Sequence, residues 1–298
     1  MSYAAEVLAD SICDGDRLIT VQVTFPRFIL AEVNTHRVFS RNSASSRAIP
    51  PEKHIERILD EAFVPDVFCQ RVKGMGQGQP VEDQDHALNA WLDARDFAVR
   101  QARILIDLDV AKSHVNRLLE PFMWHTAIIS ATEWENFFAL RCPVGDEVDL
   151  AFPAQPEFQW TAIKMRTAMR ASEPTELGKD EWHLPLVDAE ARRIARESSE
   201  QEPTWDASRW LCLVSAGRCA RVSFDRAGET EEPLQSYNRA ERLLDSGHLS
   251  PFEHQATPDF EFDRGNFNGW RQFRYGIPSE HNRVGKLEER AGWEVVPA

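Results

Sequence analysis

Two polar clusters in the sequence carry side chains that could bind a phosphorylated small molecule. The first is rich in histidine, arginine and hydroxyl groups: His36, Arg37, Ser40, Arg41, Asn42, Ser43, Ser45, Ser46 and Arg47. Arginine forks and hydroxyls together supply several hydrogen-bond donors to a phosphate. The second comprises His248, Ser250, Glu253 and His254. The first cluster also fits a solvated loop, and the second fits a helix start with Ser250 as N-cap in a capping box with Glu253.

Other polar features fit structural roles better. Residues 73–80 contain a Gly-x-Gly-x-Gly pattern, but it follows no strand and lacks the lysine of a phosphate-binding loop. His125 has apolar surroundings, which favours a hydrogen-bonded core histidine over a ligand. His183 has no second histidine at ligand spacing, so we expect no metal site. Solvated carboxylates on a polar helix face are expected at Asp93, Asp96 and Asp107.

The composition indicates a folded, acidic protein. The chain of 298 residues has 34 Lys+Arg and 48 Asp+Glu, which gives a net charge of −14. This acidity disfavours a nucleic-acid surface, so a nucleotide is expected as substrate rather than as polymer. Its 42% apolar residues allow a sizeable core, and no apolar run approaches a membrane span or signal peptide, so we expect a cytoplasmic protein. Reduced, mostly buried thiols are expected at Cys13, Cys69, Cys142, Cys212 and Cys219.

The elements that must position the two clusters follow from hydrophobic periodicity. Apolar residues alternate over 18–25, which predicts a half-buried strand in a hairpin with 5–12, and we expect a polar loop over 40–47. A loop is expected at 73–80 and a short strand at 258–263. Helical spacing is expected over 27–37, 51–64, 84–110, 111–142 with an interruption near Pro121, 157–171, 188–200 and 233–246. Mixed α/β character is expected from 208–225 onward.

Five stretches resemble a known family. Residues 35–47 resemble the signature of flavin-dependent thymidylate synthases, R-H-R, seven residues, then S and x-R, with seven residues between Arg37 and Ser45. H-L-S-P-F-E-H at 248–254 resembles the family's H-x-[ST]-P-x-E-H, and A-R-V-S-F at 220–224 resembles the block before it. N-R-L-L-E-P at 116–121 and W-E-N-F-F-A-L-R at 134–141 resemble two further blocks.

The order of these blocks differs from that of the usual family member. There the H-x-[ST]-P-x-E-H and A-R-V-S-F blocks precede the R-H-R signature, whereas in this chain they follow it. We therefore interpret the chain as a divergent, circularly permuted member with one catalytic domain over 1–298 and a connector at about 188–205. The resemblance implies an α+β fold, with a mixed or antiparallel sheet packed with long helices. It also implies a homotetramer with sites shared between subunits, so we expect Ser45 and Glu253 in one pocket or in pockets completed across an interface.

The resemblance further implies transfer of a one-carbon unit from 5,10-methylenetetrahydrofolate to C5 of dUMP, with FAD as cofactor and NADPH as electron source. Flavin contacts would be His36, Arg37, Asn42, Asn136, His248, Ser250 and Glu253. Contacts to dUMP would be Ser45, Ser46, Arg47, Arg117 and Arg141. Of these, Arg117 would bind the phosphate. Arg141 would act in catalysis by stabilising negative charge on the pyrimidine.

Departures from the family pattern leave alternatives open. Thr35 replaces the first arginine of the signature, Glu32 replaces a glutamine, and 130–132 lacks the family's N-x-R. Gln272 or Arg274 could replace the lost groups, although a surface strand-to-helix segment is the favoured explanation. Altered contacts would also fit flavin-dependent hydroxymethylation of dUMP or dCMP. A flavin- or nucleotide-binding module without turnover is the remaining alternative.

Overall fold

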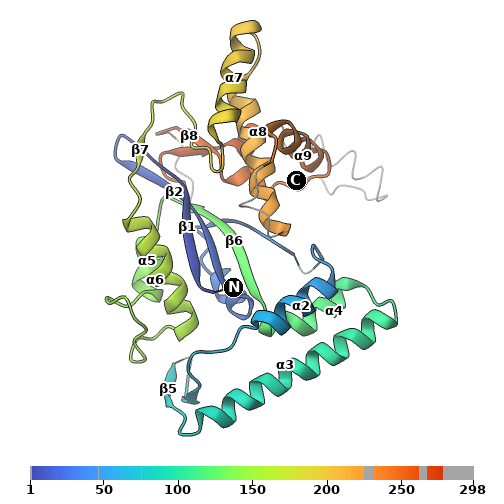
Figure 1. The fold of residues 1–298 in the computed structure, drawn as a ribbon. Coiled ribbons are helices and arrows are strands. Elements are labelled where there is room, and N and C mark those ends of the chain that lie inside the picture. The colour runs from blue at the N-terminus through green and yellow to red at the C-terminus, as the bar shows by residue number, and fades with distance from the viewer. Residues whose placement is uncertain (1, 46, 75, 225–230, 262–266, 278–298) are drawn as a thin grey trace, which may run out of the picture.

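A five-stranded sheet of order β3-β6-β2-β1-β7 organises the protein (Figure 1). The computed structural model describes residues 2–45, 47–74, 76–224, 231–261 and 267–277. The antiparallel strands are β1 (Ala4–Cys13), β2 (Asp16–Pro26), β3 (Ser40–Ser43) and β6 (Trp124–Ala131). The short β7 (Thr175–Glu176) adds parallel to β1, so the sheet is mixed. The expected α+β class, with a mixed sheet and long helices, is confirmed.

The hairpin of β1 and β2 forms as the alternation predicts. Its turn residues Asp14 and Gly15 have φ of 48° and 96°, the left-handed conformations that a tight hairpin turn requires. The inward face of β2 carries buried side chains at every second position: Ile19, Val21, Val23 and Phe25. The polar hairpin tip and the alternating strand therefore act together to fix the register of the first two strands.

The prediction of a helix over 111–142 is wrong for the middle of this range. The chain forms α4 (Lys112–Leu119), the 3-10 turn η2 (Glu120–Phe122), strand β6 and then α5 (Glu135–Arg141). Strand β6 lies inside the sheet and is buried on both faces, with Ile129 in the main core and Ile128 in a second cluster. A strand buried on both faces reads as a continuous apolar run, which periodicity cannot distinguish from a helix.

Two expected loops are partly strands. Residues 40–43 of the polar stretch form β3, which pairs with β6, although all four of its side chains are polar. Residues 77–80 form β5 (Gln77–Pro80), which pairs with β4 (Cys69–Arg71). In both cases the backbone hydrogen bonds of a neighbouring strand override a weak local preference. The strand expected at 258–263 is instead β8 (Ala256–Pro258), and residues 262–263 lie outside the described part of the chain.

Helices cover both faces of the sheet (Figure 1). On one face α6 (Pro156–Arg170) and α5 pack on β1, β2 and β6 together with η1 (Arg27–Ile29) and α1 (Leu30–Val33). On the other face Ile128 of β6 contacts residues of α8 (Ala207–Cys219) and η3 (Ala220–Phe224). A Cβ at Gly217 would collide with the backbone carbonyl of Ser236, so α8 and α9 (Pro233–Asp245) pack at unusually close range.

The remaining helices form two outlying groups. Helices α2 (Pro51–Glu61), α3 (Gln84–Asp107) and α4 share a separate apolar cluster beside one end of the sheet (Figure 1). Helix α7 (Ala189–Gln201) packs on α8 through Ala191 and Ala195. The last described elements are η4 (Ser250–Glu253), β8, β9 (Trp270–Gln272) and α10 (Phe273–Gly276). No helix among the described residues is long and apolar enough to cross a membrane.

A chain of buried hydrogen bonds crosses the sheet. His183 contacts the Ser11 hydroxyl through Nδ1 at 2.9 Å and the Thr20 hydroxyl through Nε2 at 2.8 Å. The Thr20 hydroxyl contacts that of Ser130 at 2.6 Å, and Ser130 contacts His254 Nδ1 at 2.8 Å. Burial lowers the pKa of both His183 and His254 to about 3. Both histidines are therefore neutral at physiological pH, which suits hydroxyl partners that carry no charge.

This network predicts that the protein loses stability in mild acid. In the unfolded chain a histidine binds a proton near its ordinary pKa of 6.5, whereas folded His183 and His254 do so only near 3. Unfolding therefore takes up protons as the pH falls below about 6.5, and the free energy of unfolding drops by roughly 1.4 kcal/mol per histidine by about pH 5.5. Urea unfolding curves at about pH 7.5 and about pH 5.5 measure this drop together with that of the other histidines whose pKa is lowered by burial, His36, His54 and His125. The control His86→Gln, at an exposed position, should keep the same pH dependence. Equal free energies at the two pH values would contradict the prediction.

Candidate functional site

Strand β3 separates the candidate site residues into two groups. Its side chains alternate, so Ser40 and Asn42 are buried against η4 and η3, while Arg41 points the other way. Arg41 donates to the backbone carbonyls of Val33 at 3.2 Å and His36 at 3.1 Å. Both faces of the strand therefore contact the rest of the protein, and the candidate residues before and after it lie at its two ends.

The first group joins β3 to the segment around residues 248–254. Asn42 Nδ2 donates to the Cys219 carbonyl at 2.9 Å, and the Ser250 hydroxyl donates to Asn42 Oδ1 at 3.1 Å. Gln272 Nε2 donates to the Ser40 hydroxyl at 2.7 Å and to the Glu253 carbonyl at 2.8 Å. Two blocks that lie far apart in the sequence thus share one hydrogen-bonded unit.

Two expectations for this segment need correction. Ser250 begins the 3-10 turn η4 without a side-chain cap, because its hydroxyl donates to Asn42 instead. Gln272 is not a surface residue, since it is 4% exposed and bridges Ser40 and Glu253. Arg274 forms an ion pair with the Glu253 carboxylate. Gln272 therefore holds the second block against β3, and Arg274 joins the Glu253 side chain of this block to α10.

The second group centres on His36 and Arg141. Arg141, the last residue of α5, donates from Nε to His36 Nε2 at 3.2 Å, and its guanidinium lies 4.7 Å from the Phe158 ring centroid. His36 is buried among the rings of Phe39, Phe137 and Phe158. The stacking and the hydrogen bond fix the guanidinium plane. Among the described residues its two terminal nitrogens make no hydrogen bond, so they remain able to bind a ligand.

Protonation of His36 is suppressed by its surroundings. Burial, together with the nearby charges of Arg141 and Arg41, lowers the pKa of His36 to about 4. A guanidinium can only donate, so Nε2 of His36 is the acceptor and the proton of the neutral ring lies on Nδ1. His36 is thus a neutral acceptor that orients Arg141 without cancelling its charge.

Most other predicted site residues lie on the surface. Arg37, Asn136 and His248 are exposed. Ser45 and Arg47 are exposed as well, and the Arg47 backbone N–H donates to the Ser45 hydroxyl at 3.3 Å. Ser46 lies outside the described residues. These side chains are available to a ligand but are not assembled into one enclosed site.

Arg117 is also accessible. Its side chain is 68% exposed, and it lies 3.6 Å from the Glu120 carboxylate. Glu120 also forms an ion pair with the buried Arg27 at 3.0 Å. Through Glu120, Arg117 therefore lies next to the polar pocket that contains Arg27, although its own side chain is largely in solvent.

This pocket lies at the far end of β3 from His36. Its lining comprises Arg27, Ala44, Ser45, Ile49, His54, Asn116, Glu120, Met123, Trp124, His125 and Thr126. Arg27 donates to His125 Nδ1 at 2.9 Å and to the Ala44 carbonyl at 3.3 Å. Neither Arg27 nor the interaction of His125 with it was predicted from the sequence. The available signal was the single arginine that directly follows Pro26 in an otherwise apolar stretch.

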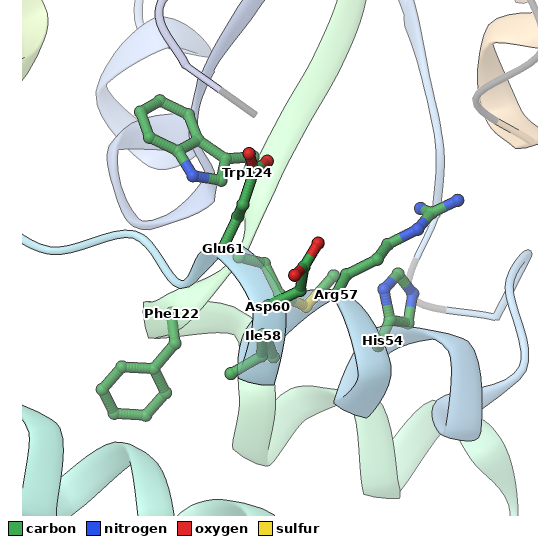
Figure 2. Close-up of a pocket in the computed structure, with 8 residues that line it drawn as sticks. His54, Arg57, Ile58, Asp60, Glu61, Phe122 and Trp124 are labelled. Carbon is green, nitrogen blue, oxygen red and sulfur yellow. The ribbon is translucent and has the colours of Figure 1, made fainter.

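A larger cavity of about 210 Å³ adjoins this pocket and shares His54, Met123 and Trp124 with it. Figure 2 shows Arg57, Asp60 and Glu61 projecting to the same side of α2. Burial, together with the charges of Arg57 and Arg27, lowers the pKa of His54 to about 4. The cavity combines opposite charges with apolar walls, and none of the sequence-predicted site residues lines it.

Within one chain, the predicted residues are thus brought together only in part. Asn42, Ser250 and Glu253 gather on one side of β3, whereas His36 and Arg141 pair on the other. In the described part of the chain, Glu253 is not among the residues that line the pocket beside Ser45. Among the described residues no group of three or more His, Cys, Asp or Glu side chains could hold a metal ion.

Comparison with known proteins places these residues in context. Residues 18–175 match the family model described as "Thymidylate synthase complementing protein". No curated protein matches significantly. One solved structure, the UMP/dUMP methylase PolB from Streptomyces cacaoi with 5-Br UMP, has 17% identity and a TM-score of 0.45, and covers 56% of this chain and 88% of its own. The same methylase with 5-Br dUMP has 20% identity and a TM-score of 0.41, and covers 51% of this chain and 65% of its own.

The two asparagines assigned to flavin contacts should respond differently to truncation. Asn42→Ala removes one buried and one partly buried hydrogen bond and leaves the Cys219 carbonyl and the Ser250 hydroxyl without this partner. We expect a loss of about 2–3 kcal/mol in the free energy of unfolding, measured by urea denaturation. The matched control Asn136→Ala changes an exposed residue of α5 and should stay within about 0.5 kcal/mol of the wild type. Equal effects of the two substitutions would show that Asn42 does not hold the blocks together.

Proposed function

The chain belongs to the thymidylate synthase complementing protein family, and from this premise we propose that it methylates dUMP to dTMP. The one-carbon donor is 5,10-methylenetetrahydrofolate, the cofactor is FAD and the electron source is NADPH. The observation that carries the proposal is the Arg141–His36 pair, in which a fixed guanidinium keeps its terminal donors available.

Arg141 acts on the pyrimidine. Its two terminal nitrogens match the carbonyl edge of a pyrimidine, and a planar fork binds such an edge better than an ammonium group. As C5 becomes nucleophilic, negative charge develops on the ring and is stabilised by the preoriented guanidinium. His36 must stay neutral to accept from Arg141 Nε, and its pKa of about 4 ensures this at physiological pH.

The cysteines support a mechanism without a thiolate nucleophile. Burial raises the pKa of Cys142, next to Arg141, and raises that of Cys219 to about 12. The pKa values of Cys13, Cys69 and Cys212 are also raised. A thiol with a raised pKa forms little of the thiolate that attacks a pyrimidine. The chemistry that bound FAD would supply is hydride transfer to the pyrimidine.

The surface donors fit a flavin cofactor. Arg37 and Asn136 are exposed beside the His36–Arg141 group, and His248 and Ser250 are exposed in the segment that contacts the other side of β3. These four side chains offer charged and neutral donors that suit phosphates and ring carbonyls without disturbing the core. Asn42 does not fit as a contact, because both ends of its amide are engaged within the protein. We assign Asn42 a positioning role.

A site shared between subunits accounts for the separation of the candidate residues into two groups on opposite sides of β3. Residues on opposite sides of β3 would contact the same flavin if part of the site came from a second copy. We therefore propose a homotetramer whose sites are completed across interfaces. The proposal accounts for the exposure of Arg47 and Asn136, which line neither of the pockets described above.

Circular permutation accounts for the order of the blocks. The family match covers 18–175, whereas Arg221 and the segment 248–254 come later in the chain. The hydrogen bonds from Ser250 and Gln272 to β3 support a common unit formed from both parts. We propose a single domain over 1–298, with the segment around α7, about 188–205, as connector.

One observation favours an altered outcome of the reaction. Ser130 stands where the family has a flavin-contacting asparagine, and it is buried in hydrogen bonds to Thr20 and His254. A changed flavin contact would fit hydroxymethylation of dUMP or dCMP by the same site. A binding module without turnover is the remaining candidate.

The product distinguishes these candidates. We expect the purified protein to bind FAD and, with methylenetetrahydrofolate and NADPH, to convert dUMP into a nucleotide with the mass of dTMP. Mass spectrometry of parallel reactions with dUMP and dCMP measures this. A hydroxymethyl product, or turnover of dCMP alone, would establish the alternative. FAD binding without any nucleotide product would indicate the binding module, and the absence of FAD binding would contradict both flavin enzymes.

Arg141→Lys should reduce turnover more than nucleotide affinity. Lysine keeps the charge but loses the planar fork, so the largest loss should occur when charge builds on the pyrimidine, with kcat falling roughly a hundredfold. Steady-state kinetics and equilibrium dUMP binding separate the two effects. The control is Arg170→Lys, which changes an exposed arginine that also ends a helix. If Arg141→Lys has unchanged kcat and only a lower Tm, as the control would, then Arg141 merely stabilises the end of α5.

A further inference from the structure

Three residues that line the pocket at the end of β3 carry a buried donor atom without a partner among the described residues: Arg27, Trp124 and His125. Arg27 is 9% exposed and His125 is 4% exposed, and both line the pocket together with Ser45. Arg27 Nε and His125 Nε2 make no hydrogen bond in the described part of the protein. Buried polar atoms are rarely left unsatisfied, because each costs on the order of 1–3 kcal/mol. Two such atoms on residues that touch each other indicate a site for an acceptor.

The hydrogen bond between these residues fixes what His125 can offer. Arg27 can only donate, so His125 Nδ1 is the acceptor in their 2.9 Å contact. Burial and the charge of Arg27 lower the pKa of His125 to about 3, so the ring is neutral. A neutral ring that accepts at Nδ1 carries its proton on Nε2. The unpartnered atom of His125 is therefore a donor, like Arg27 Nε.

The charges around the pocket favour an anion. Arg27 and Arg117 share the single carboxylate of Glu120, at 3.0 Å and 3.6 Å. One positive charge of this trio is therefore uncompensated, while His125 and His54 are neutral because their pKa values are lowered to about 3 and about 4. A negatively charged group would complete the balance, and charge-assisted hydrogen bonds from arginine to phosphate are among the strongest.

The size of the pocket limits how much of a ligand can enter. Its volume is about 10 Å³, close to the space of one water molecule. One oxygen atom of a phosphate fits, whereas the whole phosphate does not. The remaining oxygens would stay near the exposed Ser45, whose hydroxyl keeps its proton for donation while it accepts from the Arg47 backbone.

We propose that Arg27 and His125 bind one phosphoryl oxygen of the 5′-phosphate of the pyrimidine nucleotide. This inference rests on the proposed function and adds two phosphate-binding residues outside the family blocks. Arg27 supplies the charged donor, His125 supplies a neutral donor and holds the guanidinium in place, and Glu120 anchors the far side of the guanidinium. A water molecule held in the same pocket without any role in binding is the competing explanation.

The test compares dUMP with deoxyuridine, which lacks the phosphate. Isothermal titration of the full-length protein with FAD in excess gives both affinities for the wild type, Arg27→Lys and His125→Phe. The control is Arg17→Lys, because Arg17 likewise pairs with a buried carboxylate, that of Asp10 at 2.6 Å, but lies outside the pocket. A melting curve verifies that each variant is folded.

We expect both pocket variants to bind dUMP at least about tenfold more weakly, since each removes a donor to the phosphate, while Arg17→Lys stays within about twofold. Deoxyuridine affinity should change by less than about twofold in all variants. Unchanged dUMP affinity in both pocket variants, or equal losses for dUMP and deoxyuridine, would overturn the inference and favour the water. If the wild type binds neither dUMP nor dCMP, the proposed function fails, and this inference fails with it. If the His125→Phe substitution prevents folding, Arg27→Lys decides alone.

Discussion

The pairing of β3 with β6 determines the directions in which the candidate site residues of β3 point. The register Ser40↔Ser130 to Ser43↔Ala127 sends Ser40 and Asn42 toward η4 and Arg41 toward the main core. A slip of one residue would exchange these directions, because side chains alternate along a strand. The hydrogen bonds on both sides of β3 make such a slip costly. With the register fixed, His36 lies before one end of the strand and Ser45 lies after the other, on the two sides where we expect parts of a nucleotide to bind.

A hydrogen bond from an arginine to a buried, neutral histidine occurs at both ends of β3. Arg141 donates to His36 at one end, and Arg27 donates to His125 at the other. Burial keeps each histidine neutral, so it accepts from the arginine without adding charge of its own. Each arginine is thereby oriented while it retains donors for a ligand. In our account one pair binds the pyrimidine and the other binds the phosphate.

The sequence predicted what local patterns determine and missed what depends on distant partners. The alternation in β2 and the helical spacing of α3 were sufficient, because each element buries one face. Strand β6 was mistaken for a helix, because it is buried on both faces and has no alternation. The motifs pointed to Ser250, but its cap role could not be rejected without knowing that Asn42 lies beside it. The contact of Arg27 with His125 joins residues 98 positions apart, outside any motif.

The central claim is that the two arginine–histidine pairs hold the two ends of one nucleotide. A crystal structure of the protein with dUMP and FAD tests it most directly. Our account predicts the pyrimidine against the terminal nitrogens of Arg141 and a phosphate oxygen within hydrogen-bond distance of Arg27 Nε and His125 Nε2, with the two pairs supplied by one chain or by two. A nucleotide bound in the cavity beside α2, or elsewhere without contact to either arginine, would contradict it.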